Sequence, residues 1–445
     1  MRTGTTPYRS EPHTPFRAGR SLTSPSGYCR QSTIRISGPI RSRLGAERFG
    51  FGVSVSVSVL DRAESLGSEL IDIRRAVHAR PELGFQETST QVFIREAIGR
   101  LAPGTACRAI AGTGLLASVA NGSHAILVRA CMDGLPIQER SDLAFASTAP
   151  GVSHACGHDG QVAVLVGAIA LLAQSPPEAA VFALFQPAEE IDTGARAVLD
   201  DGVLDAVRPD VVLGFHGHPG LDAGTVAVRP GPMMASITTI RAQIAGHAGH
   251  GAEPHLAADS VTAAASLILD WQIALSRRID PRQPVVLSVG RISAGSTANV
   301  IPGSAELEGT LRSLDPAIEE SLKRIMADVA RGVEVRTGTT VDLQADLVVP
   351  AVVNDAGVAS LAAAAISDLL GPDAVVDAPP SLGGDDFAWY LQETPGCYVF
   401  IGERVAGREP YGWHDAAYDL DERSLSIGSA VLAAIVHRIA KEGGG

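Results

Sequence analysis

Cysteine is scarce in this 445-residue chain, and no apolar run is long enough to cross a membrane. The cysteines are odd in number and scattered, which is not the pattern of a disulfide framework and favours a reducing, cytoplasmic location. They are Cys29, Cys107, Cys131, Cys156 and Cys397. The longest apolar run, VAVLVGAIALLA (162–173), falls short of the roughly 20 residues of a membrane-spanning helix. It predicts a buried helix, and we expect no membrane partner.

Positive charge is also in short supply beyond the N-terminal segment. Residues 1–60 hold nine arginines and only two acids, Glu11 and Glu47, a net charge of +7. Because the whole chain has a net charge of −13, the remaining residues sum to −20. An acidic body of this kind argues against nucleic acid or an anionic membrane as a partner.

Residues 1–60 lack sustained periodicity and are predicted to be a disordered basic leader. An arginine- and serine-rich leader with few acids is typical of organelle transit peptides. A dispensable tail and a misassigned start codon are the two simpler interpretations, and we favour them. Within this segment FGVSVSVSVL (51–60) alternates like a strand.

The next part of the chain predicts an α/β domain. A helix is expected from residue 61 until Pro81 ends it. Apolar strands then alternate with helices, which is typical of a mostly parallel sheet. The strands are expected at 125–130, 180–185, 210–215 and 397–402, with helices at 160–174 and 194–200.

Residues 232–344 follow a different pattern. Four segments alternate like half-buried strands, and amphipathic helices are expected near 259–277 and 316–333. This composition predicts a small α+β sandwich inserted into the first domain. The catalytic domain would then comprise 61–231 and 345–445. The stretch 237–244 is apolar enough to be an exposed edge strand, although a strand covered within the same chain fits equally well.

Residues able to ligate a metal follow the predicted strands, at the sheet edge where α/β proteins bind ligands. Each has an ordinary structural explanation when taken alone, but together they form a metal-ligand inventory. In chain order they are Cys131 and Asp133, Cys156 and His158 in SHACGHDGQ (153–161), Glu189 and Glu190, His216, and His414.

A cysteine nucleophile is the rival chemistry, because Cys156 would need only a nearby histidine base and an orienting partner. Cys156 and His158 stand two residues apart, so an extended loop turns both side chains to one side. That arrangement suits chelation better than proton abstraction, and paired glutamates have no evident role in thiol catalysis.

The chain resembles the M20 metallopeptidase family over about residues 70–440. The similarity is to its aminoacylase-like amidohydrolases, which include hippurate hydrolases and auxin-conjugate hydrolases. Its ordered motifs are RRAVHARPELGFQE (74–87), VRACMDGLPIQE (128–139), HACGHDG (154–160), FQPAEE (185–190), GHAGHGAEPH (246–255), STANVIP (296–302) and GGDDFAWY (383–390), followed by the segment of His414.

The resemblance implies a zinc-peptidase-like catalytic domain that holds two divalent ions, Mn, Zn, Co or Ni, and cleaves N-acyl or N-aroyl amino acids. It implies the ligands Cys156, His158, Glu190, His216 and His414, with Cys156 bridging the ions. Glu189 would be the general base and acid, and Asp133 would orient a ligand.

The resemblance also assigns a role to the inserted domain, which would form a homodimer and act as a lid. It would supply His250 to the oxyanion across the dimer. Asn299 and Arg312 would bind the amide and the carboxylate of the substrate, although Arg312 has an alternative interpretation as a surface arginine.

Four positions depart from the family pattern. They are Cys131 in place of Asp, Gln161 in place of His, His218 in place of an aromatic residue, and Asp385 in place of Glu. Cys131 has three interpretations: a metal ligand, a redox partner of Cys156, or a packed side chain. Because no ligand is lost, we expect an active enzyme; an inactive conjugate-binding relative and a thiol hydrolase using Cys156 are the alternatives.

Overall fold

A computed structural model of the chain describes residues 58–442. Residues 1–57, which contain all but the last three residues of the predicted basic leader (1–60) and of the alternating segment 51–60, therefore lie outside the described residues. The last residues of that alternating segment are helical, because α1 spans Val59–Ser65. Ser58 caps this helix: its side chain accepts a hydrogen bond from the backbone N–H of Asp61, whose carboxylate in turn accepts from the Ser58 N–H.

The predicted N-terminal helix is broken in two at Leu66, and a third helix follows Pro81. After α1, α2 spans Gly67–His78 and α3 spans Thr88–Leu101. Later helices of the same domain are α4 (His158–Gln174), α5 (Gly194–Asp200), α6 (Val203–Val207), α9 (Ala356–Leu370), α10 (Ala388–Glu393) and α11 (Arg423–Glu442).

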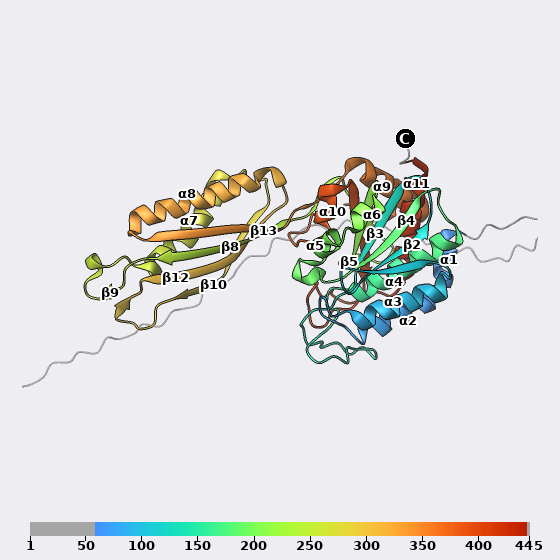
Figure 1. Ribbon diagram of the computed structural model, residues 1–445, viewed down its shortest axis with the longest axis horizontal. Coiled ribbons are helices and arrows are strands. Elements are labelled where there is room, and N and C mark those ends of the chain that lie inside the picture. The colour runs from blue at the N-terminus through green and yellow to red at the C-terminus, as the bar shows by residue number, and fades with distance from the viewer. Residues whose placement is uncertain (1–57, 443–445) are drawn as a thin grey trace, which may run out of the picture. The chain divides into compact units, whose positions relative to one another are not determined.

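An eight-stranded sheet in the order β1-β2-β4-β3-β5-β16-β6-β15 forms the centre of this domain (Figure 1). The strands are β1 (Ala106–Ile110), β2 (Gly114–Ala120), β3 (Ala125–Cys131), β4 (Ala180–Gln186), β5 (Val211–Asp222), β6 (Val226–Ala227), β15 (Val375–Val376) and β16 (Gly396–Arg404). The four predicted strands β4, β3, β5 and β16 are neighbours, and they pair in parallel. The predicted mostly parallel α/β sheet is therefore confirmed.

The predicted buried helix is α4, in which every residue from His158 to Leu172 is buried. It packs against α11, which also packs against α9. Among residues 58–442, α11 is the one helix long and apolar enough to cross a membrane, but 67% of its apolar window is buried in the protein. Core helices of soluble proteins pass the same test, so α11 is interpreted here as a core helix.

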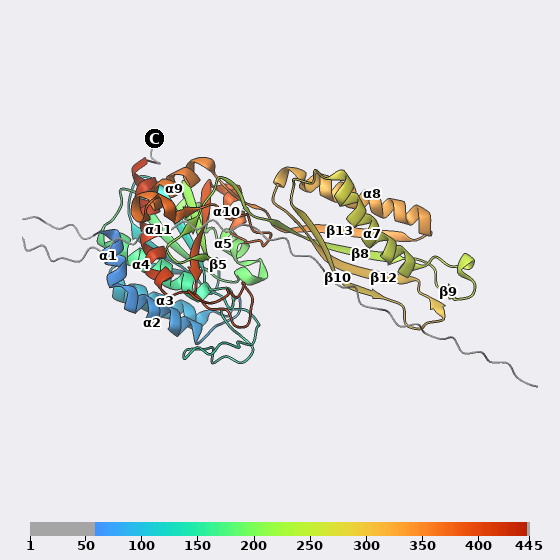
Figure 2. The ribbon, with the colours of Figure 1, turned by 180° about the vertical axis from the view of Figure 1, so that it is seen from behind.

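The inserted domain is a separate antiparallel sheet in the order β10-β12-β8-β13. Its strands are β8 (Ser236–Ala245), β10 (Val285–Ala294), β12 (Ser304–Ser313) and β13 (Thr340–Val349), and its helices are α7 (Ser260–Arg278) and α8 (Glu319–Thr337). Figures 1 and 2 show both helices on one face of this sheet. The core between sheet and helices includes Trp271, whose indole N–H donates to the backbone oxygen of Met326.

In the insert, the second of the two interpretations of 237–244, a strand covered within the same chain, is confirmed, and one boundary differs from the prediction. The segment 237–244 is not an edge, because β8 pairs with β12 on one side and with β13 on the other. The edges are β10 and β13. β13 continues to Val349, beyond the predicted boundary at 344, because its pairing with β8 extends to Ile237. Short strands complete the chain: β7 (Gly231–Met234), β9 (Gly249–His250), β11 (Val300–Ile301) and β14 (Val352–Asn354).

Candidate metal centre and active site

The carboxyl ends of the parallel strands bring the predicted ligands together. Asp133 follows β3, Glu189 and Glu190 follow β4, and His216 lies within β5. Cys156 and His158 stand at the N-terminus of α4, where Gly157 adopts the left-handed conformation with φ of 80°. His414 comes from the loop after β16, and its backbone N–H donates to the oxygen of Ala155.

The five predicted ligands form two groups that share Cys156. The first is Cys156, His158 and His216, and the second is Cys156, Glu190 and His414; within each group the ligand atoms lie within 4.8 Å of one another. Cys156 Sγ is 3.4 Å from His216 Nε2, and His414 Nε2 is 3.3 Å from Glu190 Oε2.

The chemistry of these side chains fits two divalent ions. His158 Nε2 and Glu190 Oε1 are buried without a hydrogen-bond partner among residues 58–442, although such atoms are normally paired. Each lies in one of the two ligand groups, so a cation in each group would satisfy it. A thiolate, imidazoles and a carboxylate are suitable donors for Zn, Mn, Co or Ni.

Asp133 connects ligands of the two groups. Its backbone oxygen lies 3.0 Å from His158 Nδ1 and its Oδ1 lies 3.3 Å from the same nitrogen. Its Oδ2 accepts a hydrogen bond of 3.0 Å from the backbone N–H of Glu190. Holding Nδ1 in this way directs Nε2 of His158 toward the site, as is common for histidine ligands.

The two buried imidazoles have opposite electrostatic surroundings. Burial lowers the pKa of His158, but its hydrogen bond to Asp133 and the charge of Glu190 outweigh that effect and raise the pKa to about 9. Burial and the positive charge of His158 lower the pKa of His216 to about 4. Without an ion His216 is therefore neutral at physiological pH, whereas a cation at His158 must displace the proton that Asp133 and Glu190 stabilise there.

The carboxylate of Glu189 lies beside the two ligand groups. It is buried, and burial together with the charges of Asp385 and Glu190 raises its pKa well above the ordinary value. Its Oε2 lies 3.6 Å from His158 Nε2. A carboxylate with a raised pKa accepts a proton more readily, which is what a general base requires.

Beside Glu189 lies a buried ion pair that the sequence does not predict. Arg129 is fully buried, and its guanidinium contacts Asp385 at 3.0 Å and Asp386 at 2.6 Å. The hydroxyl of Tyr398 also donates to Asp385 at 2.5 Å. Asp385, one of the departures from the family pattern, is therefore fixed by Arg129 and Tyr398.

Glu87, at the end of the first motif, holds the loop that carries Glu189. Its Oε1 accepts a 2.8 Å hydrogen bond from the backbone N–H of Ala188, and its Oε2 accepts from the hydroxyl of Thr113. Ala188 is left-handed, with φ of 55°. This conformation is uncommon for alanine, so the bond from Glu87 helps to hold the residue immediately before Glu189. In the sequence, Glu87 is marked only as the last residue of the motif RRAVHARPELGFQE, which does not indicate its contact with Ala188.

A cavity of about 410 Å³ opens on four of the five predicted ligands and is of a size that suits a small molecule. It is lined by Cys156, Glu189, Glu190, Asp192, His216, Met234, Ile237, Arg312, Ser381, Gly383, Gly384, Asp385, Trp413 and His414. Arg312, predicted to bind a carboxylate, therefore lines the pocket, and its guanidinium donates to the backbone oxygen of Leu382.

His250 and Asn299 are not brought into this cavity. His250 lies on β9, and Asn299 precedes β11, which pairs with β9. His250 follows the Ala245 end of β8, and Asn299 precedes Ser304 of β12, which pairs with Ala245. Both residues therefore lie at the end of β8 away from the cavity residue Ile237, and ten strand residues span roughly 30 Å. Their predicted contribution to a site is therefore not made within one chain and stays a prediction.

Cys131 is fully buried beside the centre. Its sulfur lies within 4.8 Å of ligand atoms of His158 and Glu189, and burial raises the pKa of its thiol well above the ordinary value. Its backbone N–H donates to Gln161 Oε1 at 3.0 Å. Two departures from the family pattern, Cys131 and Gln161, are thus in direct contact.

Known proteins are similar to this chain in sequence and in fold. The model of peptidase family M20/M25/M40 matches residues 127–438. The chain belongs to this family. It is 36% identical to the N-acetyl-L-cysteine deacetylase of Bacillus subtilis over 375 residues, which cover 83% of this chain and 87% of that protein. It is 35% identical to the N-acetyldiaminopimelate deacetylase of Exiguobacterium sibiricum over 358 residues, 80% of this chain and 95% of that one.

A solved structure shares the fold of this chain. A Bacillus subtilis protein described as a dinuclear metal binding peptidase of the M20 family superposes with a TM-score of 0.75 at 33% identity. The match covers 85% of this chain and 99% of that one. The predicted M20 fold and metal-dependent hydrolase are confirmed by these relatives.

Proposed function

We propose that this protein hydrolyses the amide bond of N-acyl or N-aroyl amino acids with two divalent ions. The observation that carries the proposal is the sharing of Cys156 by two ligand groups, with Glu189, which belongs to neither of these two groups, beside them. The similarity to two deacetylases of N-acetylated amino acids supports the substrate class.

The pocket offers separate places for the parts of such a substrate. Arg312 presents a planar guanidinium, which pairs well with a carboxylate. Met234, Ile237 and Trp413 provide apolar surface for the acyl group. Cys156, Glu190, His216, His414 and Glu189 line the same cavity as Arg312, so a substrate whose carboxylate binds Arg312 shares that cavity with the ligands.

The catalytic steps of this chain's own residues follow from these positions. When bound, two divalent ions polarise the amide carbonyl and lower the pKa of water. Glu189 accepts the proton of the attacking water and returns it to the departing amine nitrogen. Asp133 keeps His158 oriented throughout, and Glu87 keeps Ala188, and with it Glu189, in place.

A hydrolysis screen tests this function. We expect the metal-free protein, reloaded separately with Zn, Mn, Co or Ni, to release free amine from at least one N-acetyl or N-benzoyl amino acid. N-acetylcysteine and N-acetyldiaminopimelate belong in the panel. Binding of these compounds without turnover under every metal would favour the inactive conjugate-binding alternative instead.

A thiol hydrolase remains the second candidate because Cys156 Sγ lies 3.4 Å from His216 Nε2. Burial and the charge of Glu190 raise the pKa of Cys156 well above the ordinary value, which disfavours a free thiolate nucleophile. A bound cation would stabilise that thiolate, so the same burial is compatible with a ligand role. Activity that survives complete chelation would favour the thiol hydrolase.

We also propose that the inserted domain forms a homodimer and that His250 acts at the site of the other copy. The domain exposes Leu269 and Ile273 on α7 and Ile292 on the edge strand β10. Burying such side chains between two copies would stabilise the pair. The roughly 30 Å between His250 and the Ile237 end of β8 leaves the partner's pocket as the site that His250 can serve.

This arrangement predicts that His250→Ala lowers kcat while metal content stays unchanged. Mixing His250→Ala with Glu189→Gln protein should restore activity, because a mixed dimer contains one intact composite site. Light scattering at micromolar concentration measures the oligomeric state directly. A fully active monomer, or no recovery on mixing of proven dimers, would contradict the proposal.

A further inference from the structure

The first sequence motif, RRAVHARPELGFQE, contributes no ligand, yet its Arg74 lies at the centre of a buried network of charges. Arg74 is on α2 and is 1% exposed. Its Nε donates to Asp159 Oδ2 at 3.0 Å, its Nη2 to Asp419 Oδ1 at 3.0 Å and its Nη1 to Glu422 Oε1 at 3.1 Å. One guanidinium therefore binds three carboxylates.

These carboxylates belong to the two segments that carry ligands of the centre. Asp159 is fully buried and directly follows His158 at the N-terminus of α4. Asp419 lies in the loop that carries His414 to α11. His158 belongs to one ligand group and His414 to the other, and Cys156 is common to both. Arg74 thus connects the segment of His158 to the segment of His414 by hydrogen bonds to Asp159 and Asp419.

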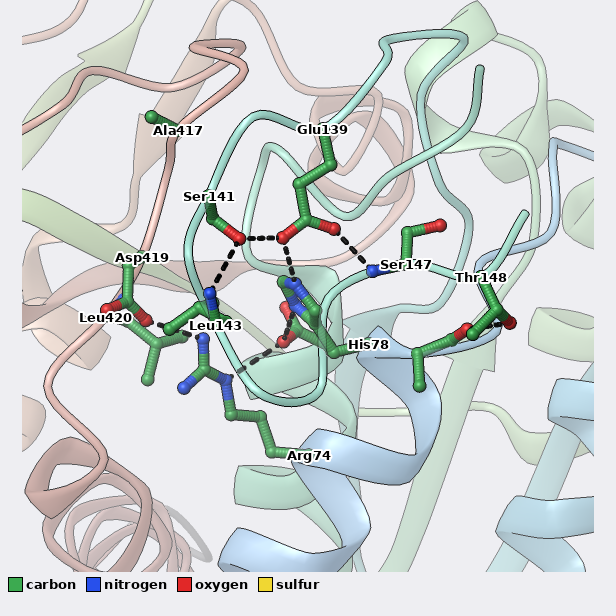
Figure 3. Close-up of polar contacts among 12 residues, drawn as sticks. Arg74, His78, Glu139, Ser141, Leu143, Ser147, Thr148, Ala417, Asp419 and Leu420 are labelled. Atoms are coloured by element: carbon green, nitrogen blue, oxygen red, sulfur yellow. Dashed lines mark hydrogen bonds and ion pairs between the residues drawn. The ribbon is translucent and has the colours of Figure 1, made fainter. Parts of the chain in front are cut away.

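A second arm of the network joins another loop to the same segments (Figure 3). His78, one turn after Arg74 on α2, contacts Asp159 Oδ2 at 2.8 Å and Glu139 Oε1 at 3.2 Å. Glu139 accepts from the backbone N–H of Ser147 at 2.6 Å. The adjacent Arg140 N–H donates to the oxygen of Ala416, two residues after His414.

We infer that Arg74 is a positioning residue that sets the spacing of His158 and His414, and hence of the two ions, through Asp159 and Asp419. The inference rests on the proposed dinuclear site. Only a guanidinium presents donors in several fixed directions within one plane. A lysine at this position retains the charge but cannot hold three separate carboxylates in the same geometry.

The test compares Arg74→Lys with Arg75→Lys in the full-length protein. Arg75 is the matched control, because it also binds Glu422, at 2.9 and 2.7 Å, but it is not paired with Asp159 or Asp419. Calorimetric titration of the metal-free proteins with Zn²⁺ alone gives the affinity and stoichiometry of each binding step. Unfolding temperatures measured without metal give the purely structural effect.

We expect Arg74→Lys to weaken at least one of the two Zn²⁺ binding steps by about 10–100-fold, the usual loss when a residue that supports a ligand is changed. Arg75→Lys should bind both ions as the wild type does. Equal affinities in Arg74→Lys and wild type, whatever the change in unfolding temperature, would overturn the inference.

Asp419→Asn provides a second route if Arg74→Lys does not fold. Asp419 is partly exposed and is the network partner on the His414 side. Its replacement should weaken one Zn²⁺ step and leave the other close to wild type. Unchanged binding of both ions would likewise overturn the inference. Because these measurements need no turnover, failure of the hydrolysis screen would refute the proposed function without affecting this result.

Discussion

Glu189→Gln is expected to lower kcat by about 10²–10⁴-fold, the contribution typical of a positioned general base, and to leave both ions bound. The amide of glutamine has nearly the same shape as the carboxylate but cannot take a proton from water. Glu189 is absent from the two ligand groups that share Cys156, so its replacement should not release an ion.

Steady-state hydrolysis of the best N-acyl amino acid, with metal content measured on the same samples, checks this expectation. Glu393→Gln at the exposed end of α10 is the matched control and should behave as the wild type. A rate for Glu189→Gln within a few-fold of wild type would exclude it as the base. Loss of both activity and metal would instead make Glu189 a ligand.

Removing metal is expected to abolish hydrolysis, and Cys156→Ala is expected to weaken both ions together. Cys156 is the one residue common to the two ligand groups, whereas His414 belongs only to the second. Cys156→Ala should therefore lower the affinity of both Zn²⁺ binding steps, and His414→Ala should lower mainly one. Losing a direct ligand should cost at least the 10–100-fold seen for residues that only support a ligand.

Two measurements separate this expectation from thiol catalysis. Dialysis against a chelator should abolish activity, and added metal should restore it. Titration of both variants with Zn²⁺ should show the difference in stoichiometry, with Cys107→Ala, a substitution on the distant strand β1, as the thiol control. Full activity after chelation, or loss of a single ion in Cys156→Ala, would contradict the shared-ligand arrangement.

The parts of the fold that the sequence predicts are those that one local pattern specifies. The strands β3, β4 and β16 are almost entirely buried, so they are continuous apolar runs, and their observed ends lie within a few residues of prediction. β5 continues seven residues past the predicted Phe215, through HGHPGLD (216–222), where glycine and proline hide the strand pattern. β1 and β2 were not predicted, because their short pattern competes with turns on both sides.

The candidate site divides in the same way. Its ligands are visible from sequence because they stand at the ends of apolar strands or in a motif dense in donors. Their supports are not visible. Arg74 meets Asp159 from 85 residues away and Asp419 from 345 residues away, and Glu87 meets Ala188 from 101 residues away. No local periodicity encodes such contacts, so only the folded chain reveals them.

The place of β16 in the sheet has a consequence for synthesis on the ribosome. β16 lies between β5 and β6, although it is among the last strands to be made. The nascent catalytic half therefore keeps an unpaired apolar strand edge on β5 until residue 404 has emerged. The inserted domain has all of its strands and helices within 236–349 and is able to fold first. During that interval β5 exposes an unpaired strand edge, and because such edges promote aggregation, a fragment released from a ribosome stalled before residue 396 is expected to aggregate.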